Sequence, residues 1–173
     1  MKKTLIVIDM QNDFVYGPLG TPEAEAIVVN VEHKIDMYRK AGHPVIFTKD
    51  LHWPNYLETH EGKRLPVPHC MVGDTKGKEL VIKPEWGEHI INKSTFGYTG
   101  WAYGFEYGVP DLIEIVGVCT DICVVSNALI LRAVYPEINI TVDASCCAGT
   151  TPENHKAALE VMKSCHIDII GEV

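Results

Sequence analysis

The sequence has no apolar run that approaches the roughly 20 residues of a membrane-spanning helix. It also lacks an excess of positive charge, because 15 Lys and Arg residues against 23 Asp and Glu residues give a net charge of −8. An acidic surface offers no counter-charge to nucleic acid or to anionic membranes, so we expect neither as a partner. No internal repeat or low-complexity tract interrupts the 173 residues, which predicts one domain over 1–173.

Several local motifs are missing as well. The six cysteines never show C-x-x-C spacing, which disfavours a zinc ribbon or a thioredoxin-like redox site. No G-x-G-x-x-G follows the first apolar run, which disfavours dinucleotide binding. That run covers 4–8 and ends at Asp9, so a strand fits it better than a signal peptide does. Cysteines without secretory features predict reduced thiols in a cytoplasmic protein.

What the chain does contain is an alternation of short apolar runs and helical patterns. Continuous apolar runs are typical of strands buried on both faces of a parallel sheet. Helical spacing predicts helices over 23–40, after Asp121 and from Pro152 onwards. The pattern predicts an α/β fold whose parallel sheet is covered on both faces. The predicted strands cover 4–8, 44–48, 89–92, the run from Leu112 towards Gly117, 138–143 and 167–170.

Two stretches stand apart from this alternation. Residues 51–88 are too long and irregular for a simple connection, and loops of this length in compact domains are usually functional or disordered. Three histidines and two tryptophans within it favour function. The aromatic-rich stretch 96–107 suits core packing by default, and also a pocket wall or a subunit contact.

The stretch 112–127 is the centre of the sequence pattern. A buried strand runs into Gly117, and a helix should start at once with Thr120 or Asp121 as its N-cap. Cys123 then falls in the first turn, where unsatisfied N–H groups and the helix dipole favour thiolate. A small buried hydrophobe is the alternative interpretation of a cysteine in this position.

Ionisable or reactive side chains stand at the carboxyl ends of four predicted strands, the edge at which open parallel sheets bind ligands. Together they form a complete set for thiol-based acyl transfer. Cys123 is the candidate nucleophile, Lys93 would favour its anion, and Asp9 could accept the thiol proton and later pass it to a leaving amine. Backbone N–H groups of Cys119 and Cys123 could hold an oxyanion.

Asp50, His52 and His69 resemble a metal site. Residues i and i+2 of an extended segment point the same way, and a following loop can supply a third ligand. Two imidazoles and a carboxylate with open positions suit zinc or iron that acts on a substrate.

These motifs together resemble the isochorismatase-like cysteine hydrolases, and within them the nicotinamidases. The resemblance rests on VIDMQNDF, FTKDLH, LPVPHC, Lys93 before an aromatic stretch, VGVCTDICV and VDASCCAGTTPENHKAAL, and it spans nearly the whole chain. It implies a Rossmann-like three-layer α/β/α fold with a six-stranded, mainly parallel sheet in the order 3-2-1-4-5-6.

The same resemblance implies a catalytic triad and a cis peptide bond between Val118 and Cys119. The triad would be Asp9, Lys93 and Cys123. It further implies a divalent metal, with zinc expected and iron or manganese as alternatives, on Asp50, His52 and His69. Glu58 and Glu61 are both candidates for a further ligand. A homo-oligomer is implied, and the pocket residues implied are Phe14, Leu19, Trp53, Phe96 and Tyr98.

The predicted activity is hydrolysis of a small carboxamide, nicotinamide to nicotinate and ammonia, through a thioester. Two alternatives stay open: a related hydrolase of another small amide or carbamoyl compound, and a catalytically silent binding protein on the same fold.

Overall fold

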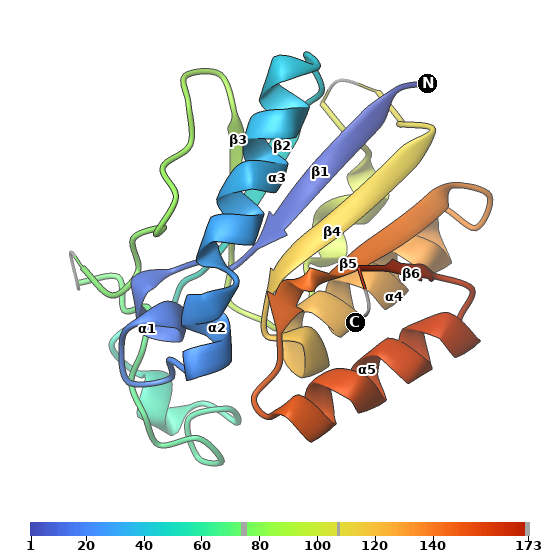
Figure 1. Ribbon diagram of the computed structural model, residues 1–173. Coiled ribbons are helices and arrows are strands. Elements are labelled where there is room, and N and C mark those ends of the chain that lie inside the picture. Colours follow the sequence, from blue (N-terminus) through green and yellow to red (C-terminus); the bar gives the residue numbers. More distant parts are fainter. Residues whose placement is uncertain (74–75, 107, 172–173) are drawn as a thin grey trace.

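A computed structural model describes residues 1–73, 76–106 and 108–171. Six strands form one sheet in the order β3-β2-β1-β4-β5-β6, and every neighbouring pair is parallel. The predicted strand order is therefore confirmed. Figure 1 shows the sheet with its helices. The strands are β1 Lys3–Ile8, β2 Val45–Asp50, β3 His89–Lys93, β4 Leu112–Val118, β5 Asn139–Ala148 and β6 Asp168–Ile170.

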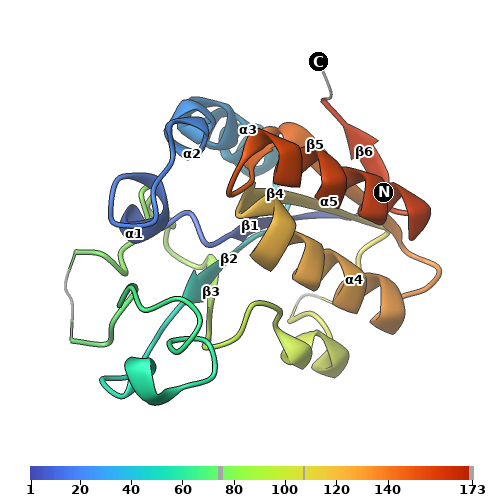
Figure 2. The same cartoon turned by 90° about the horizontal axis from the view of Figure 1, so that it is seen from below.

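Helices lie on both faces of this sheet, with α3 on one side and α4 on the other (Figure 2). Longer helices pack on the strands, while short helical turns lie in the connections. None of the helices in the described parts is both long enough and apolar enough to cross a membrane. The α-helices are α1 Asn12–Val15, α2 Pro22–Ala26, α3 Val28–Lys40, α4 Val125–Val134 and α5 Pro152–Ser164; the 3₁₀ turns are η1 Tyr56–Glu58 and η2 Thr99–Tyr103, and the π turn is η3 Thr120–Val124.

Alternate side chains of the strands build a hydrophobic core on each face. Leu5 and Val7 of β1 pack with Val31 and Ile35 of α3 on one face. Ile6 and Ile8 point the other way and belong to the core that α4 and α5 cover. All four β1 side chains are fully buried, as expected of a central strand in a doubly covered parallel sheet.

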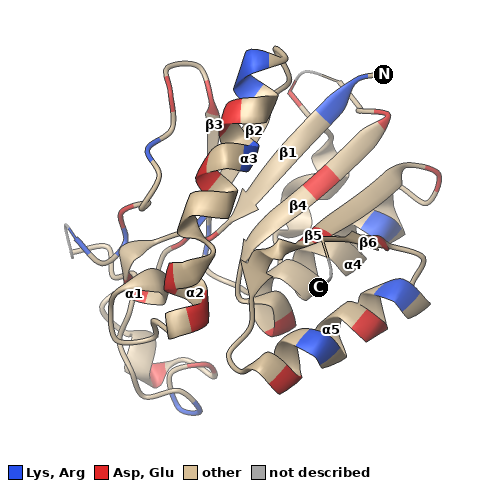
Figure 3. Ribbon diagram, viewed as in Figure 1, with Lys and Arg blue, Asp and Glu red and all other residues tan. Residues whose placement is uncertain are grey.

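Charged residues lie mostly on the helices and connections (Figure 3), but β4 carries one in its interior. Glu114 lies on the α3 face, where Lys34 Nζ approaches its carboxylate at 2.6 Å and Asp143 at 2.8 Å. The Tyr38 hydroxyl also donates to Glu114, at 2.6 Å. A buried carboxylate needs such partners, and these contacts fix α3 against β4 and β5.

Two predicted elements have different bounds. The helix predicted over 23–40 is interrupted at Ile27, whose ψ of −11° departs from helical geometry and separates α2 from α3. The strand predicted over 138–143 continues to Ala148. Its second half, Ser-Cys-Cys-Ala, shows no apolar alternation, and its pairing with β4 shifts register between Ile115 and Gly117.

Gly117 lies at this irregularity with a φ of +120°, and a Cβ there would collide with the Ile8 carbonyl oxygen. We predict that Gly117→Ala lowers the free energy of unfolding by at least about 2 kcal/mol more than Gly42→Ala does. Gly42 is the matched control, because its φ is also positive, at +69°, but nothing lies within 4 Å of its Cβ position. Urea unfolding of the two variants measures the difference, and equal losses would contradict the steric argument.

Candidate active site

A cavity of about 280 Å³ opens where β1, β2, β3 and β4 end. Apolar side chains form most of its wall, while the reactive and metal-ligating groups face one another across it. Its lining residues are Phe14, Leu19, Thr21, Asp50, Glu61, Leu65, His69, Phe96, Cys119, Ile122, Cys123 and Thr150.

The structure brings Asp9, Lys93 and Cys123 together at the base of this cavity. Lys93 Nζ lies 2.6 Å from Asp9 Oδ2 and 3.6 Å from Cys123 Sγ. All three residues are buried, with at most 6% of their surface exposed. Thr48 on β2 donates its hydroxyl to Asp9 Oδ1 at 2.6 Å and accepts from Asp9 N at 3.1 Å. These contacts hold Asp9 although its φ of +47° is unfavourable for a residue with a Cβ.

Burial controls the protonation of this cluster. It raises the pKa of the Cys123 thiol well above 9.0; the charge of Asp9 adds to the rise, and Lys93 opposes it only in part. For Lys93, burial disfavours the ammonium, but Asp9, Cys123 and Asp50 outweigh it and raise the pKa. Burial therefore opposes the thiolate that the helix terminus and Lys93 favour. Lys93 Nζ donates a hydrogen bond to Cys123 Sγ at 3.6 Å, and the same ammonium group holds the Asp9 carboxylate beside the thiol.

The turn that carries Cys123 also differs from the prediction. Residues 120–124 form a π turn, in which Val124 N donates to Cys119 O at 3.0 Å. Cys119, not Thr120 or Asp121, is the N-cap, and no side chain caps the turn. π turns are frequent at functional sites. The peptide bond between Val118 and Cys119 is cis, as the resemblance implies.

The two residues predicted as caps bind the β5–α5 connection instead. The Thr120 hydroxyl lies 2.8 Å from His155 Nδ1. Asp121 accepts hydrogen bonds from Thr150 N at 2.8 Å and from the Thr150 hydroxyl at 2.6 Å. These contacts hold Thr150 in the cavity wall, beside the π turn.

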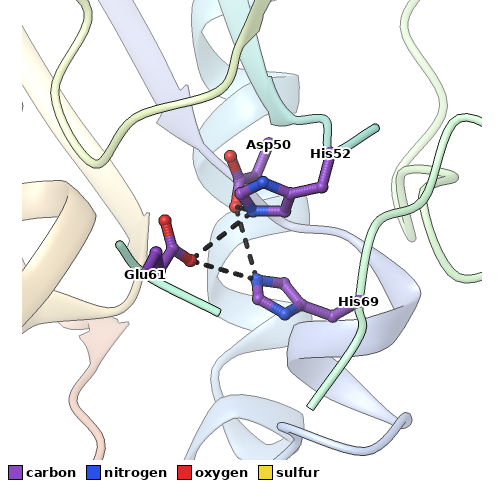
Figure 4. A group of neighbouring side chains, drawn as sticks. All are labelled: Asp50, His52, Glu61 and His69. Carbon is purple, nitrogen blue, oxygen red and sulfur yellow. Dashed lines mark hydrogen bonds and ion pairs between the residues drawn. The ribbon is translucent and has the colours of Figure 1, made fainter. Parts of the chain in front are cut away.

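Asp50, His52, Glu61 and His69 point toward one another (Figure 4), and Asp50, Glu61 and His69 line the cavity. One ligand atom from each lies within 4.8 Å of all the others. Of the two candidates for a further ligand, Glu61 belongs to this group, whereas Glu58 is exposed and lies outside it.

Neighbouring contacts orient these ligands. His69 Nδ1 lies 2.8 Å from the Val67 carbonyl, which places the proton on Nδ1 and leaves Nε2 free for an ion. Gln11 fixes Asp50 through both backbone groups, accepting from its N–H at 2.7 Å and donating to its carbonyl at 2.9 Å. Tyr56 packs against both His rings, with centroid distances of 4.6 Å and 5.1 Å.

The donor set fits a divalent ion. Two imidazoles and two carboxylates suit zinc, iron or manganese. Asp50 Oδ2 lies 2.8 Å from His52 Nε2 and 3.5 Å from His69 Nε2. Glu61 Oε1 lies 3.6 Å and 3.7 Å from the same two nitrogens, so two carboxylate oxygens and two imidazole nitrogens converge on one point, as the ligands of a divalent ion do.

Three of the five predicted pocket residues, Phe14, Leu19 and Phe96, line the cavity. The other two are not among the lining residues, and their part in substrate binding stays a prediction. Trp53 is 62% exposed and follows His52 on an extended segment, on which neighbouring side chains point in opposite directions. Tyr98 packs edge-on against Trp101, with a centroid distance of 5.2 Å, outside the cavity.

Several wall residues escaped the sequence analysis: Thr21, Leu65, Ile122 and Thr150. Leu65, Ile122 and Thr150 stand within the quoted motifs LPVPHC, VGVCTDICV and VDASCCAGTTPENHKAAL, but none of them had been assigned a role in the pocket. Tyr107, the last residue of the aromatic stretch predicted as a possible subunit contact, lies outside the described residues, and that contact stays a prediction.

Comparison with known proteins places this geometry in a family. The model of the isochorismatase domain matches residues 3–171. The chain belongs to the isochorismatase family. Among its relatives, a nicotinamidase/pyrazinamidase from Mycobacterium tuberculosis is 28% identical over 97% of this chain and 98% of its own. A probable inactive nicotinamidase from Arabidopsis thaliana is 31% identical over 92% of this chain and 87% of its own.

A solved structure agrees with this assignment. The pyrazinamidase of Pyrococcus horikoshii, determined in complex with zinc, superposes with a TM-score of 0.78. It is 28% identical, and the match covers 99% of this chain and all of that one.

The metal group yields a prediction for Glu61. Glu61→Gln should weaken zinc binding at least about tenfold, because it removes a charged oxygen ligand. Glu58→Gln is the matched control and should stay within about twofold of wild type, since that side chain is exposed and outside the group. Calorimetric titration of chelator-treated protein with zinc compares the two, and equal effects would contradict the assignment of Glu61.

The raised pKa of Cys123 yields a second prediction. In chelator-treated protein, alkylation of Cys123 by iodoacetamide should accelerate about tenfold per pH unit from pH 7 to pH 9, because the thiolate fraction grows with pH below the pKa. Peptide mass spectrometry identifies the labelled residue, and Cys123→Ser provides the blank. A rate that levels off below pH 8 would mean that the thiolate is already formed.

Proposed function

We propose that this protein is a cysteine amidase that hydrolyses a small aromatic carboxamide, with nicotinamide as the substrate and nicotinate and ammonia as the products. The observation that carries the proposal is the common cavity, in which Cys123 and the group of metal ligands face the same space. The distance of 2.6 Å between Lys93 and Asp9 supports it, because it places an acid–base group beside the sulfur.

The first step transfers the thiol proton of Cys123 to Asp9 as the sulfur attacks the amide carbon. Lys93, protonated and 3.6 Å from Sγ, stabilises the negative charge that develops on sulfur. A nucleophile that is neutral at rest and deprotonated only during attack needs a base in contact with it. Asp9 is the candidate base, because Lys93 Nζ contacts both its carboxylate, at 2.6 Å, and the Cys123 sulfur, at 3.6 Å.

The tetrahedral intermediate places a negative charge on the former carbonyl oxygen. The backbone N–H groups of Cys119 and Cys123 border the turn from β4 into the helix, and we assign them to that oxyanion. Collapse of the intermediate breaks the C–N bond, and Asp9 returns its proton to the leaving nitrogen. Ammonia departs and a thioester on Cys123 remains.

Hydrolysis of the thioester reverses these roles. Asp9, again a carboxylate, takes a proton from water as its oxygen attacks the acyl carbon. The sulfur leaves as a thiolate beside Lys93 and is reprotonated, which frees nicotinate. Each proton that Asp9 accepts is thereby given back within one turnover.

The remaining parts of the cavity suit an aromatic ring. Phe14, Leu19 and Phe96 supply apolar wall. Asp50, His52, Glu61 and His69 would hold a divalent ion, which when bound supplies a Lewis acid for a ring nitrogen of the substrate.

The metal group favours a ring amide over the alternative of an open-chain amide or carbamoyl compound, which offers no aromatic nitrogen to an ion. The intact contacts of Asp9, Lys93 and Cys123 weigh against a silent binding protein. Such a protein has no use for a buried ammonium and two carboxylates around a thiol.

We predict that Cys123→Ala lowers ammonia release from nicotinamide by at least about 10⁴-fold, because it removes the thiol that contacts Lys93 and forms the acyl intermediate. Cys165→Ala is the control and should retain wild-type activity, since that thiol is outside the cavity. A coupled assay for ammonia measures both variants. Normal turnover by Cys123→Ala would refute the mechanism, whereas loss in both variants would point to damage of the fold.

The role of the metal group is tested with two ring amides of the same shape, nicotinamide and benzamide. With metal, kcat/KM should favour nicotinamide at least about tenfold, since only its ring nitrogen can reach a Lewis acid. Removal of the metal by a chelator should reduce this preference to near unity. A preference that survives complete removal, or faster turnover of carbamoyl compounds than of either amide, would contradict the proposed substrate.

A further inference from the structure

Asn127, one helical turn after Cys123, is fully buried and uses its whole side-chain amide. Oδ1 accepts hydrogen bonds from Tyr98 N at 3.0 Å and from Trp101 Nε1 at 2.9 Å. Nδ2 donates to Phe96 O at 3.1 Å and to Cys123 O at 2.8 Å. An amide side chain has two acceptor and two donor positions, and all four are occupied.

These four bonds join two separate parts of the cavity. Phe96, Tyr98 and Trp101 belong to the segment that follows Lys93, whereas Cys123 belongs to the π turn before α4. Phe96 lines the same cavity as Cys123, and 44% of its surface is exposed, so burial fixes its side chain only in part. Its position therefore depends on its backbone, which Asn127 binds directly.

Two further contacts show how closely this segment lies against α4. A Cβ on Gly97 would meet the end of the Ile130 side chain and would lie 3.3 Å from Ser126 Cβ, so the chain passes close to α4 at this point. The Tyr135 hydroxyl donates to Trp101 O at 2.8 Å. Of these contacts, the hydrogen bonds of Asn127 alone reach both the Phe96 backbone and the backbone of Cys123.

We infer that Asn127 is a positioning residue for the amidase reaction: it sets the separation between the Phe96 wall, against which the substrate ring lies, and the Cys123 sulfur that attacks the amide. This inference rests on the proposed function. Asn127 touches neither substrate nor sulfur and acts through the two residues that it connects. A displacement of about 1 Å between a bound substrate and its nucleophile can cost about 100-fold in rate.

A buried amide with four hydrogen bonds also stabilises the fold, so the test must separate stability from positioning. Asn127→Leu has similar volume and removes all four bonds. Asn127→Asp keeps the shape and the two acceptor interactions, and loses at least one donor. If the Leu variant does not fold, as judged by circular dichroism and urea unfolding, the Asp variant takes its place.

Two control variants change α4 without touching the connection between Phe96 and Cys123. Arg132→Met removes hydrogen bonds from the same helix to Pro136, Ile138 and His166, all outside the cavity. Tyr135→Phe removes the bond to Trp101 O alone. Both should keep kcat/KM for nicotinamide within about threefold of wild type, although Arg132→Met loses stability.

The decisive experiment is a double-mutant cycle with Phe96→Ala. Asn127→Leu alone should lower kcat/KM for nicotinamide about 30- to 100-fold, with Asn127→Asp intermediate. In the Phe96→Ala background, Asn127→Leu should lower kcat/KM by less than about threefold, because the side chain that Asn127 positions is gone. Alkylation of Cys123 by iodoacetamide at one fixed pH should change less than about threefold in every variant, since Asp9 and Lys93 are intact.

Three results would overturn the inference: an undiminished effect of Asn127→Leu in the Phe96→Ala background, a fall in alkylation parallel to the fall in turnover, or wild-type kcat/KM in both Asn127 variants.

If wild-type protein releases no ammonia from any amide, the proposed function fails by itself. The double-mutant cycle is then repeated with the affinity for pyridine-3-carboxaldehyde as its readout. The Cys123 S–H adds to the carbonyl of this aldehyde and gives a thiohemiacetal. If wild-type protein does not bind this aldehyde, the inference is refuted as well.

Discussion

A buried ammonium group is the interaction on which the rest of the site depends. Lys93 Nζ lies among Asp9 Oδ2 at 2.6 Å, Cys123 Sγ at 3.6 Å and Asp50 Oδ1 at 3.7 Å. Removal of a charge from water is costly unless opposite charges replace the solvent, so Lys93 and its two carboxylates require one another. The same burial keeps the Cys123 sulfur protonated until a base takes its proton.

The parallel register of the sheet brings these groups together. Asp50 and Lys93 are direct register partners on β2 and β3. Asp9 follows Ile8, whose partner on β4 is Gly117, and the turn that carries Cys123 begins three residues further on, at Thr120. Side chains more than 100 residues apart in the chain therefore meet because four parallel strands end at the same edge of the sheet. The long segment 51–88 then adds Glu61 and His69 from outside the sheet, which is how the cleft gains its metal group.

Much of this could be predicted from sequence, because it depends on local pattern. Continuous apolar runs identified the strands, and the residues that end them identified Asp9, Asp50, Lys93 and Cys123. Thr151, a residue type favoured at helix N-caps, does cap α5: its hydroxyl oxygen accepts a hydrogen bond from Asn154 N at 3.1 Å. The strand order and the cis bond came from the family motifs and not from spacing.

The remaining features depend on tertiary contacts that no local pattern records. Thr120 and Asp121 are good capping residues, but His155 and Thr150 compete for their side chains, and the turn becomes a π turn. Leu65 and Thr150 enter the cavity from distant loops. Asn127 had no signal in the sequence at all, because a polar residue in an amphipathic helix is normally solvated. Trp53 is absent from the cavity lining, and the alternation of side chains along an extended segment already separates it from His52.

The central claim, an acyl group held on Cys123, is tested most directly by partitioning with a second nucleophile. Hydroxylamine competes with water for a thioester and yields a hydroxamate beside nicotinate. If nicotinamide and methyl nicotinate pass through the same acyl-enzyme, both must give the same ratio of hydroxamate to nicotinate, because the leaving group has departed before partitioning. Equal ratios are the predicted result. A ratio that changes with the leaving group, or nicotinate formed without any hydroxamate, would contradict the account.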